Sequence, residues 1–244
     1  MTKYEEGKKM EIYITGDKHG DLRSLVEFSQ EKKLNKDDII IILGDAGINY
    51  LPNNDLRCFL AKEYFSNHIT CTLFLVHGNH EDNPEDIEEM ITKEWNGGTV
   101  YYEEEFPNIL YAKDGEIYEL NGKKYVALGG AYSIDKGYRL THGWRWFENE
   151  QMTPEVRQRC EDNLEKANWE VDVVLSHTVP ISAEPVEEFI EGIDQSKVDK
   201  TTEIWLEKIK NKLTYRNWYA GHFHCEKTKP DNIEILFETI KPIE

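Results

Sequence analysis

The stretch IYITGDKHG, residues 12–20, decides the fold of this chain. A short run of apolar and β-branched residues leads directly into a turn that carries Asp17 and His19. Short apolar runs of this kind are typical of buried strands in parallel sheets. In an open α/β sheet, ligands bind beyond the carboxyl ends of the strands. The stretch therefore predicts a strand with two metal-capable side chains at the ligand-binding edge of its sheet.

The same arrangement recurs further along the chain. Apolar runs end in metal-capable side chains in IIIILGD, residues 39–45, LFLVHGNH, residues 73–80, VDVVLSH, residues 171–177, and WYAGHFH, residues 218–224. Taken alone, each ending has an ordinary explanation as turn residues or as a hydrogen-bonded core histidine. Five such endings at strand termini instead favour one metal site built from residues that are far apart in sequence.

Helical patterns separate several of these runs. Asp21 is a candidate N-cap for a helix with apolar residues in 22–26, and residues 56–64 carry a stripe made of Leu56, Phe59, Leu60 and Tyr64. Thr153 followed by Pro154 is a typical helix start. The alternation of strands and helices over the first part of the chain favours parallel β-α-β units.

The middle of the chain has a different pattern. Residues 116–120 and 123–128 flank Asn121-Gly122, which is a strong signal for a tight hairpin, so an antiparallel portion is expected there. We predict an α/β fold with two mixed sheets packed as a sandwich and flanked by helices, in a single domain over residues 1–244. Residues 131–149 are predicted to form a long functional loop that covers the substrate.

Composition and charge restrict the class of function. Hydrophobic residues make up 39% of the chain, which is enough for a sizeable core. The formal net charge of -18 at pH 7 disfavours long nucleic acid as a partner. No stretch approaches the ~18 apolar residues of a membrane span, and Met1–Met10 has no apolar leader segment. The four cysteines form no CxxC pair, so we predict a cytoplasmic protein in a reducing compartment, without a membrane partner.

The order and identity of these motifs resemble the calcineurin-like metallophosphoesterases. The pattern of that family is D-x-H, G-D, G-N-H, a lone H and G-H-x-H, and here it extends from Asp17 to His224. The resemblance implies a four-layer αββα sandwich and a metal-dependent phosphoric ester hydrolase. It also implies a role for each matching side chain: Asp17, His19 and His224 hold one metal, Asn79, His177 and His222 hold the other, Asp45 bridges the two, and His80 faces the substrate.

The chemistry of these ligands agrees with that assignment. Imidazole, carboxylate and amide ligands without a thiolate suit two divalent transition-metal ions, with Mn favoured and Fe, Zn or Ni as alternatives. A bridging carboxylate such as Asp45 holds two cations roughly 3.5–4 Å apart, where they activate a hydroxide and neutralise the phosphoryl group. His80 would be catalytic by protonating the leaving group or by stabilising charge on the phosphoryl oxygens.

The second motif departs from the family pattern. Many members read G-D-x-x-D-R-G there, whereas residues 44–50 read GDAGINY and lack both the second aspartate and the arginine. This difference weakens the case for a Ser/Thr protein phosphatase. Arg139, His142 and Arg145 in the 131–149 loop are candidate substrate-binding residues, because arginine next to aromatic residues recognises phosphate and planar groups. A packed surface flap is the alternative interpretation of the same residues.

The predicted function is hydrolysis of phosphate monoesters or diesters by a dinuclear metal centre that activates a hydroxide. The alternatives are a cyclic nucleotide phosphodiesterase or nuclease, a Ser/Thr protein phosphatase, and a metal-binding scaffold without activity. The expected partner is a small phosphorylated substrate, with a nucleotide as one candidate. The sequence leaves the oligomeric state open.

Overall fold

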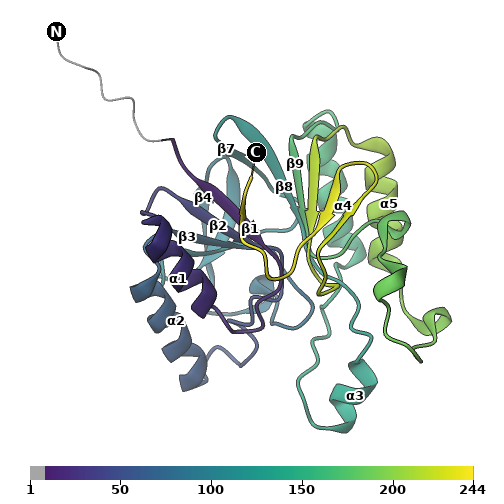
Figure 1. Ribbon diagram of the computed structural model, residues 1–244, viewed down its shortest axis with the longest axis horizontal. Helices are drawn as coiled ribbons and strands as arrows, with labels where there is room; N and C mark the ends of the chain where they lie inside the picture. Colours follow the sequence, from purple (N-terminus) through teal and green to yellow (C-terminus); the bar gives the residue numbers. More distant parts are fainter. Residues whose placement is uncertain (1–8, 244) are drawn as a thin grey trace.

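Two β-sheets pack face to face in the centre of the molecule, and helices cover the outer face of each sheet (Figure 1). The computed structural model describes residues 9–243. Most of the stretch Met1–Met10, in which no leader is predicted, lies outside the described residues. The predicted α/β sandwich with two mixed sheets and flanking helices is confirmed.

The first sheet has seven strands in the order β13 (Lys241–Pro242), β1 (Ile12–Thr15), β2 (Ile39–Ile42), β3 (Thr72–Leu75), β6 (Ile109–Ala112), β5 (Gly98–Tyr102) and β4 (Ile91–Trp95). The second sheet has six strands in the order β11 (Lys227–Lys229), β12 (Ile233–Ile235), β10 (Asn217–Ala220), β9 (Val173–Ser176), β8 (Lys123–Leu128) and β7 (Ile117–Leu120). The α-helices of the described residues are α1 (Arg23–Lys32), α2 (Leu56–His68), α3 (Lys136–Thr141), α4 (Pro154–Lys166) and α5 (Thr201–Lys212). Short 3-10 helices are η1 (Pro84–Asp86), η2 (Ile181–Ala183), η3 (Val186–Glu188) and η4 (Gln195–Lys197).

Each sheet has a parallel centre and antiparallel edges. Strands β1, β2, β3 and β6 are parallel neighbours, and so are β8, β9, β10 and β12. The hairpin expected at Asn121-Gly122 is present as the antiparallel pair β7 and β8. The second sheet is nevertheless largely parallel, since β8 continues into β9 through the crossover helix α4. The carboxyl ends of β1, β2, β3, β9 and β10 therefore meet at one end of the sandwich.

Three layers of apolar side chains hold the four structural layers together. The central one joins the two sheets and includes Ile14, Phe74 and Leu175. A second layer packs the first sheet against α1 and α2, and a third packs the other sheet against α4 and α5. Figure 1 shows the two helical layers on opposite sides of the sheets. Burial of these apolar surfaces, at about 25 cal/mol per Å², supplies the main stabilisation of the fold that positions the strand ends.

One helix interpretation needs correction, and the orientation of another helix was left open by the sequence. The apolar stripe of α2 faces solvent: Leu56 is 68% exposed and Leu60 is 49% exposed. The opposite face, which carries Cys58, Lys62 and Phe65, is buried, and the Lys62 ammonium pairs there with the Glu103 carboxylate, with Nζ and Oε2 2.5 Å apart. The helix after Asp21 begins at Arg23 without a side-chain cap.

The segment 131–149 is not a plain loop, because it contains the short helix α3 at the bottom of Figure 1. Its role in covering the substrate and the single domain over residues 1–244 stay predictions. Within residues 9–243, no helix is both long and apolar enough to cross a membrane.

Candidate metal centre

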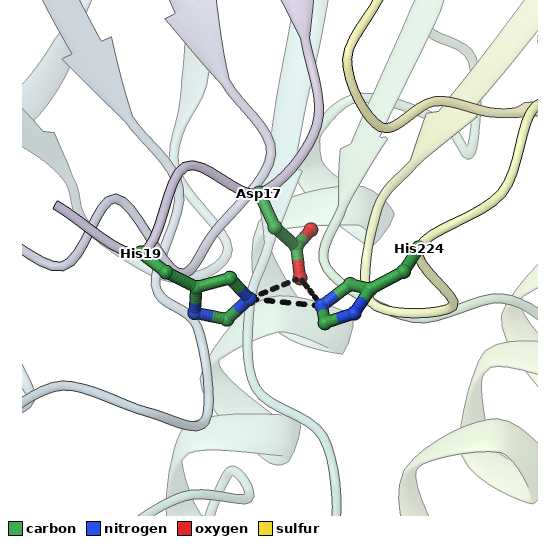
Figure 2. Close-up of side chains that lie close together, drawn as sticks. All are labelled: Asp17, His19 and His224. Carbon is green, nitrogen blue, oxygen red and sulfur yellow. Dashed lines mark hydrogen bonds and ion pairs between the residues drawn. The ribbon is translucent and has the colours of Figure 1, made fainter. Parts of the chain in front are cut away.

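The strand ends bring together the side chains that the motifs predicted to share a site. Asp17 and His19 follow β1, and His224 follows β10 in the other sheet. The Asp17 Oδ2 atom lies 3.8 Å from His19 Nε2 and 3.2 Å from His224 Nε2, and the two imidazole nitrogens are 2.8 Å apart (Figure 2). Three ligand atoms thus converge on one point, as a cation requires.

A second group of ligand atoms lies beside the first. His177 Nε2 is 2.7 Å from Asn79 Oδ1 and 3.6 Å from Asp45 Oδ2. His222 Nδ1 is 3.1 Å from the same Asn79 oxygen. Asp17 belongs to both groups of close carboxylate and imidazole atoms, whereas Asp45 belongs to the second. The assignment of Asp45 as the bridge, which rests on the family resemblance, stays a prediction.

In both aspartates, one carboxylate oxygen accepts a backbone hydrogen bond and the other accepts no hydrogen bond from the described residues. Asp17 Oδ1 accepts the backbone N–H of His222, and Asp45 Oδ1 accepts the backbone N–H of His80, both at 2.8 Å. The Oδ2 atoms of Asp17 and Asp45 are buried and have no hydrogen-bond partner among the described residues. An unpartnered buried carboxylate oxygen costs several kcal/mol. The donor set therefore fits the divalent cations that the motifs imply.

Protons on the histidines offset the carboxylate charge. Burial alone would lower the pKa of His177, but the nearby Asp45 and Asp17 carboxylates outweigh it and raise that pKa to about 9. The His177 imidazolium then donates from Nδ1 to the Leu43 carbonyl and from Nε2 to Asn79. The hydrogen bond to Leu43 fixes the ring and aims Nε2 at the carboxylates, so a metal would replace the Nε2 proton.

The backbone of the site is held in a conformation that side chains rarely adopt. His19, Asp45, His222 and His224 have φ angles of 46°, 47°, 70° and 50°. Each left-handed residue of this kind costs roughly 1–2 kcal/mol, which the surrounding fold must offset. Their concentration at four candidate ligands is typical of a functional site.

Close packing between neighbouring strand ends explains two glycines of the motifs. A Cβ atom on Gly78 would lie 2.1 Å from Asp45 Oδ1, and a Cβ atom on Gly221 would lie 2.4 Å from Asp17 Oδ1. Each glycine therefore lets the loop of one strand end touch the carboxylate of another. The glycine in G-N-H and in G-H-x-H is a requirement of the assembled site.

His80 stands between two cavities at the centre. One cavity, of about 240 Å³, is lined by Asp45, Asn79 and His222, and the other, of about 510 Å³, by His19 and Arg139, while His80 lines both. Arg139 Nη2 lies 3.4 Å from His80 Nε2, and because a guanidinium can only donate, the proton of His80 is on Nδ1. Burial lowers the pKa of His80, so the ring is neutral at pH 7.

The other two predicted substrate-binding residues, Arg145 and His142, lie away from the centre. The Arg145 guanidinium makes two hydrogen bonds to the Asp82 carboxylate at 2.9 Å and one to the Tyr50 carbonyl. His142 stacks on Tyr138, with ring centroids 3.9 Å apart. Neither side chain lines a cavity at the centre. Their role stays a prediction, and Arg139 alone of the three contacts the site.

Two further residues support the centre, and the motifs did not predict them. Ser133 accepts a hydrogen bond from the Asn79 amide nitrogen at 2.8 Å, which turns the amide oxygen toward the histidines. Glu81 accepts the backbone N–H groups of Ala46 and Gly47, both at 3.2 Å, and so fixes the turn after Asp45. Ser133 carries no sequence signal, whereas the position of Glu81 directly after G-N-H does provide one.

The fold and the strand-end centre together define a metal-dependent phosphoesterase. The chain belongs to the calcineurin-like phosphoesterase family, whose model matches residues 10–226. A search of the curated proteins gave no significant match. One solved crystal structure is similar at 14% sequence identity and covers 93% of this chain and 89% of its own, with a TM-score of 0.49.

Proposed function

We propose that this protein is a dinuclear-metal phosphoesterase that hydrolyses monoesters or diesters of small phosphorylated molecules. The observation that carries the proposal is the pair of buried, unpartnered Oδ2 atoms of Asp17 and Asp45, which lie among imidazoles from both sheets. Divalent cations would bind these oxygens and would displace the proton that His177 now holds next to them.

The ligand set supports two sites. Asp17, His19 and His224 would hold one ion, Asn79, His177 and His222 the other, and Asp45 would bridge them. When bound, divalent ions would neutralise phosphoryl oxygens and supply an activated water. Mn is the favoured metal because the set mixes imidazole, carboxylate and amide ligands without a thiolate, and Fe, Zn and Ni fit the same set.

His80 and Arg139 supply the protein's own contribution to the reaction. His80 lines both cavities at the centre, so its neutral ring would act by a hydrogen bond to a phosphoryl oxygen, and only its imidazolium form would protonate the leaving group. Arg139 is held by Asp135, with Nε and Oδ2 2.8 Å apart, so its position is fixed before substrate binds. A guanidinium in this position binds phosphoryl oxygens.

The position after Asp45 offers no support for a Ser/Thr protein phosphatase. Asn49, which stands where the family pattern has its arginine, is 1% exposed and accepts a hydrogen bond from the Tyr111 hydroxyl. It lines neither cavity at the centre. Cyclic nucleotide phosphodiesterase or nuclease activity, and a scaffold without activity, remain the alternatives for experiment.

The test is metal-dependent hydrolysis of two matched esters. The protein is stripped with a chelator, restored with Mn, Fe, Zn or Ni, and assayed with an aryl phosphate monoester and its diester from pH 6 to 9. We expect turnover that needs metal, with Mn most effective. The ratio of monoester to diester hydrolysis then separates phosphatase from phosphodiesterase.

The control is His80→Gln, which keeps a polar side chain but loses the titratable ring. It should bind the same amount of metal and lose most turnover. Two bound metals without turnover on either ester would contradict the general activity and favour a scaffold. No bound metal at all would contradict the whole proposal.

A further inference from the structure

The smaller cavity at the centre has two walls that do not belong to the metal ligands. One wall comes from Tyr132 and Ile134, at the start of the 131–149 segment, and the other from residues 188–200 between β9 and α5. His80 and Asn79 form the floor on the metal side. A substrate whose phosphoryl group is bound at the metal centre would therefore extend its remaining part into this cavity.

The rim of the cavity carries exposed apolar side chains. Ile134 is 40% exposed and Ile190 is 63% exposed, and the two come from different segments. Inside, Phe189 and Phe223 lie nearly parallel, with ring centroids 6.3 Å apart and planes at 15°. Apolar surface that gathers around a cavity from separate segments is typical of a ligand site.

One buried polar group faces this apolar surrounding. Glu203 is 3% exposed and lines the cavity, and its Oε1 accepts the Thr178 hydroxyl at 2.9 Å. Its Oε2 is buried and has no hydrogen-bond partner among the described residues. A carboxylate oxygen in this state is stabilised by a ligand that brings an N–H or O–H donor.

Ion pairs hold the outer wall in place. Lys227 Nζ lies 2.6 Å from Glu188, and Lys229 Nζ lies 3.1 Å from Glu187. These pairs connect residues 187–188 to β11. The cavity is thus formed before a ligand enters, which reduces the entropy lost on binding.

We propose that this cavity binds the leaving group of the substrate and that this group carries one aromatic ring system with an N–H donor, of the nucleobase class. The donor would bond Glu203 Oε2, and the ring would lie against Phe189, Phe223 and the two isoleucines. The volume of about 240 Å³ is below the roughly 300–1,000 Å³ of drug-sized pockets, so it suits one ring system and no polymer. This inference rests on the proposed phosphoesterase function.

The experiment measures equilibrium binding of adenosine and of purine riboside, which lacks only the exocyclic amino group. Calorimetry is done on the metal-restored protein at pH 8, where Glu203 is ionised, since burial raises its pKa to about 7. We expect adenosine to bind about tenfold more tightly, which is the value of one hydrogen bond to a charged group. Equal affinities, or no saturable binding of either nucleoside, would overturn the inference.

Three variants locate the binding. Glu203→Gln should abolish the discrimination between the two nucleosides and leave weak binding of both. Ile190→Ala, at an exposed position that folding tolerates, should weaken both nucleosides several-fold and keep the discrimination. Glu191→Gln changes an exposed carboxylate on the same segment that does not line the cavity, and should alter neither value. A loss of discrimination in Glu191→Gln but not in Glu203→Gln would place the ligand elsewhere.

Hydrolysis separates this inference from the function on which it rests. Metal-dependent turnover of an aryl phosphate without discrimination between the nucleosides would contradict the inference and keep the function. Discrimination between the nucleosides without any metal-dependent turnover would keep the binding site and contradict the function.

Discussion

The strand ends and the 131–149 segment both carry the charged side chains that phosphate chemistry uses, but they differ in how those side chains are satisfied. At the strand ends, Asp17 and Asp45 each keep a buried oxygen that accepts no hydrogen bond from residues 9–243. In the 131–149 segment, Arg145 is paired with Asp82 and Arg139 with Asp135. Because a buried polar atom without a hydrogen bond costs free energy, a bound cation would stabilise the strand ends, whereas the two arginine guanidiniums of the 131–149 segment already have carboxylate partners.

The largest effect is expected from Asp45→Asn, which keeps the shape and removes the charge. If Asp45 bridges the metals, both ions should be lost, and metal-restored kcat should fall about a thousandfold or more, equivalent to several kcal/mol of charge stabilisation. Metal content by mass spectrometry and kcat on the aryl monoester are the two measurements. Circular dichroism checks that the fold is retained.

Asp17→Asn is the matched comparison at the same strand-end centre. It should remove one ion and leave the other, because Asp17 would hold a single metal. Loss of both ions in Asp17→Asn but only one in Asp45→Asn would exchange the two roles, a possibility that the proximity of Asp17 to both ligand groups makes testable.

The next prediction concerns the pH dependence of stability that is due to Glu203, which lies outside the strand ends. Its Oε2 accepts no hydrogen bond from the described residues. Burial raises its pKa from 4.5 to about 7, so the folded state holds a proton that the unfolded state releases. Its contribution to stability is fully present below pH 4.5 and is lost as pH rises toward 7, by an amount of the order of 3 kcal/mol. Urea denaturation at pH 5 and pH 8 should show a larger loss of stability in the wild type than in Glu203→Gln, in which Glu81, whose pKa burial also raises to about 7, still titrates. The same slope in both proteins would assign the titration to another group.

A smaller effect is expected from Arg139→Ala. Its guanidinium lies 3.4 Å from His80, so its removal should lower kcat/KM about tenfold, as expected for one charged contact. Metal content should not change. Unchanged kcat/KM in both Arg139→Ala and Arg145→Ala would show that the 131–149 segment takes no part in substrate binding.

The smallest effect should come from Arg145→Ala. Its pairing with Asp82 is partly exposed, so the variant should lose about 1 kcal/mol of stability and keep kcat/KM. Thermal denaturation in parallel with the ester assay measures both quantities. A drop in kcat/KM as large as that of Arg139→Ala would mean that the salt bridge opens to bind substrate.

The sequence predicted the strand-end centre more completely than any other region. Apolar runs such as IIIILGD are local signals, and the parallel topology then brings their ends together. The partner of an arginine is not a local property: Asp82 lies 63 residues before Arg145, and nothing in either neighbourhood indicates the other. Ser133 and Glu203 were missed for the same reason, since their function depends on contacts across the fold.

The side of the molecule on which the apolar stripe of α2 lies could not be predicted, for a related reason. Periodicity shows that Leu56, Phe59 and Leu60 share one side of a helix, but it does not show which side meets the sheet. The buried pairing of Lys62 with Glu103 decides this, and a lysine at a core position is rare enough that pattern alone argues against it. The four-layer arrangement could nevertheless be predicted, because it depends on where helices and strands occur and not on how each helix is rotated.

The hydrogen bond from the His222 backbone to Asp17 spans 205 residues, and the one from His177 to Leu43 spans 134. Both join the first sheet to the second, so the centre exists only after the two halves of the chain have docked. Contacts of such long range form late in folding, because the loop closure they require is costly. A metal that binds only the docked state therefore stabilises that state by mass action, so that metal binding favours the completed fold over partly docked forms.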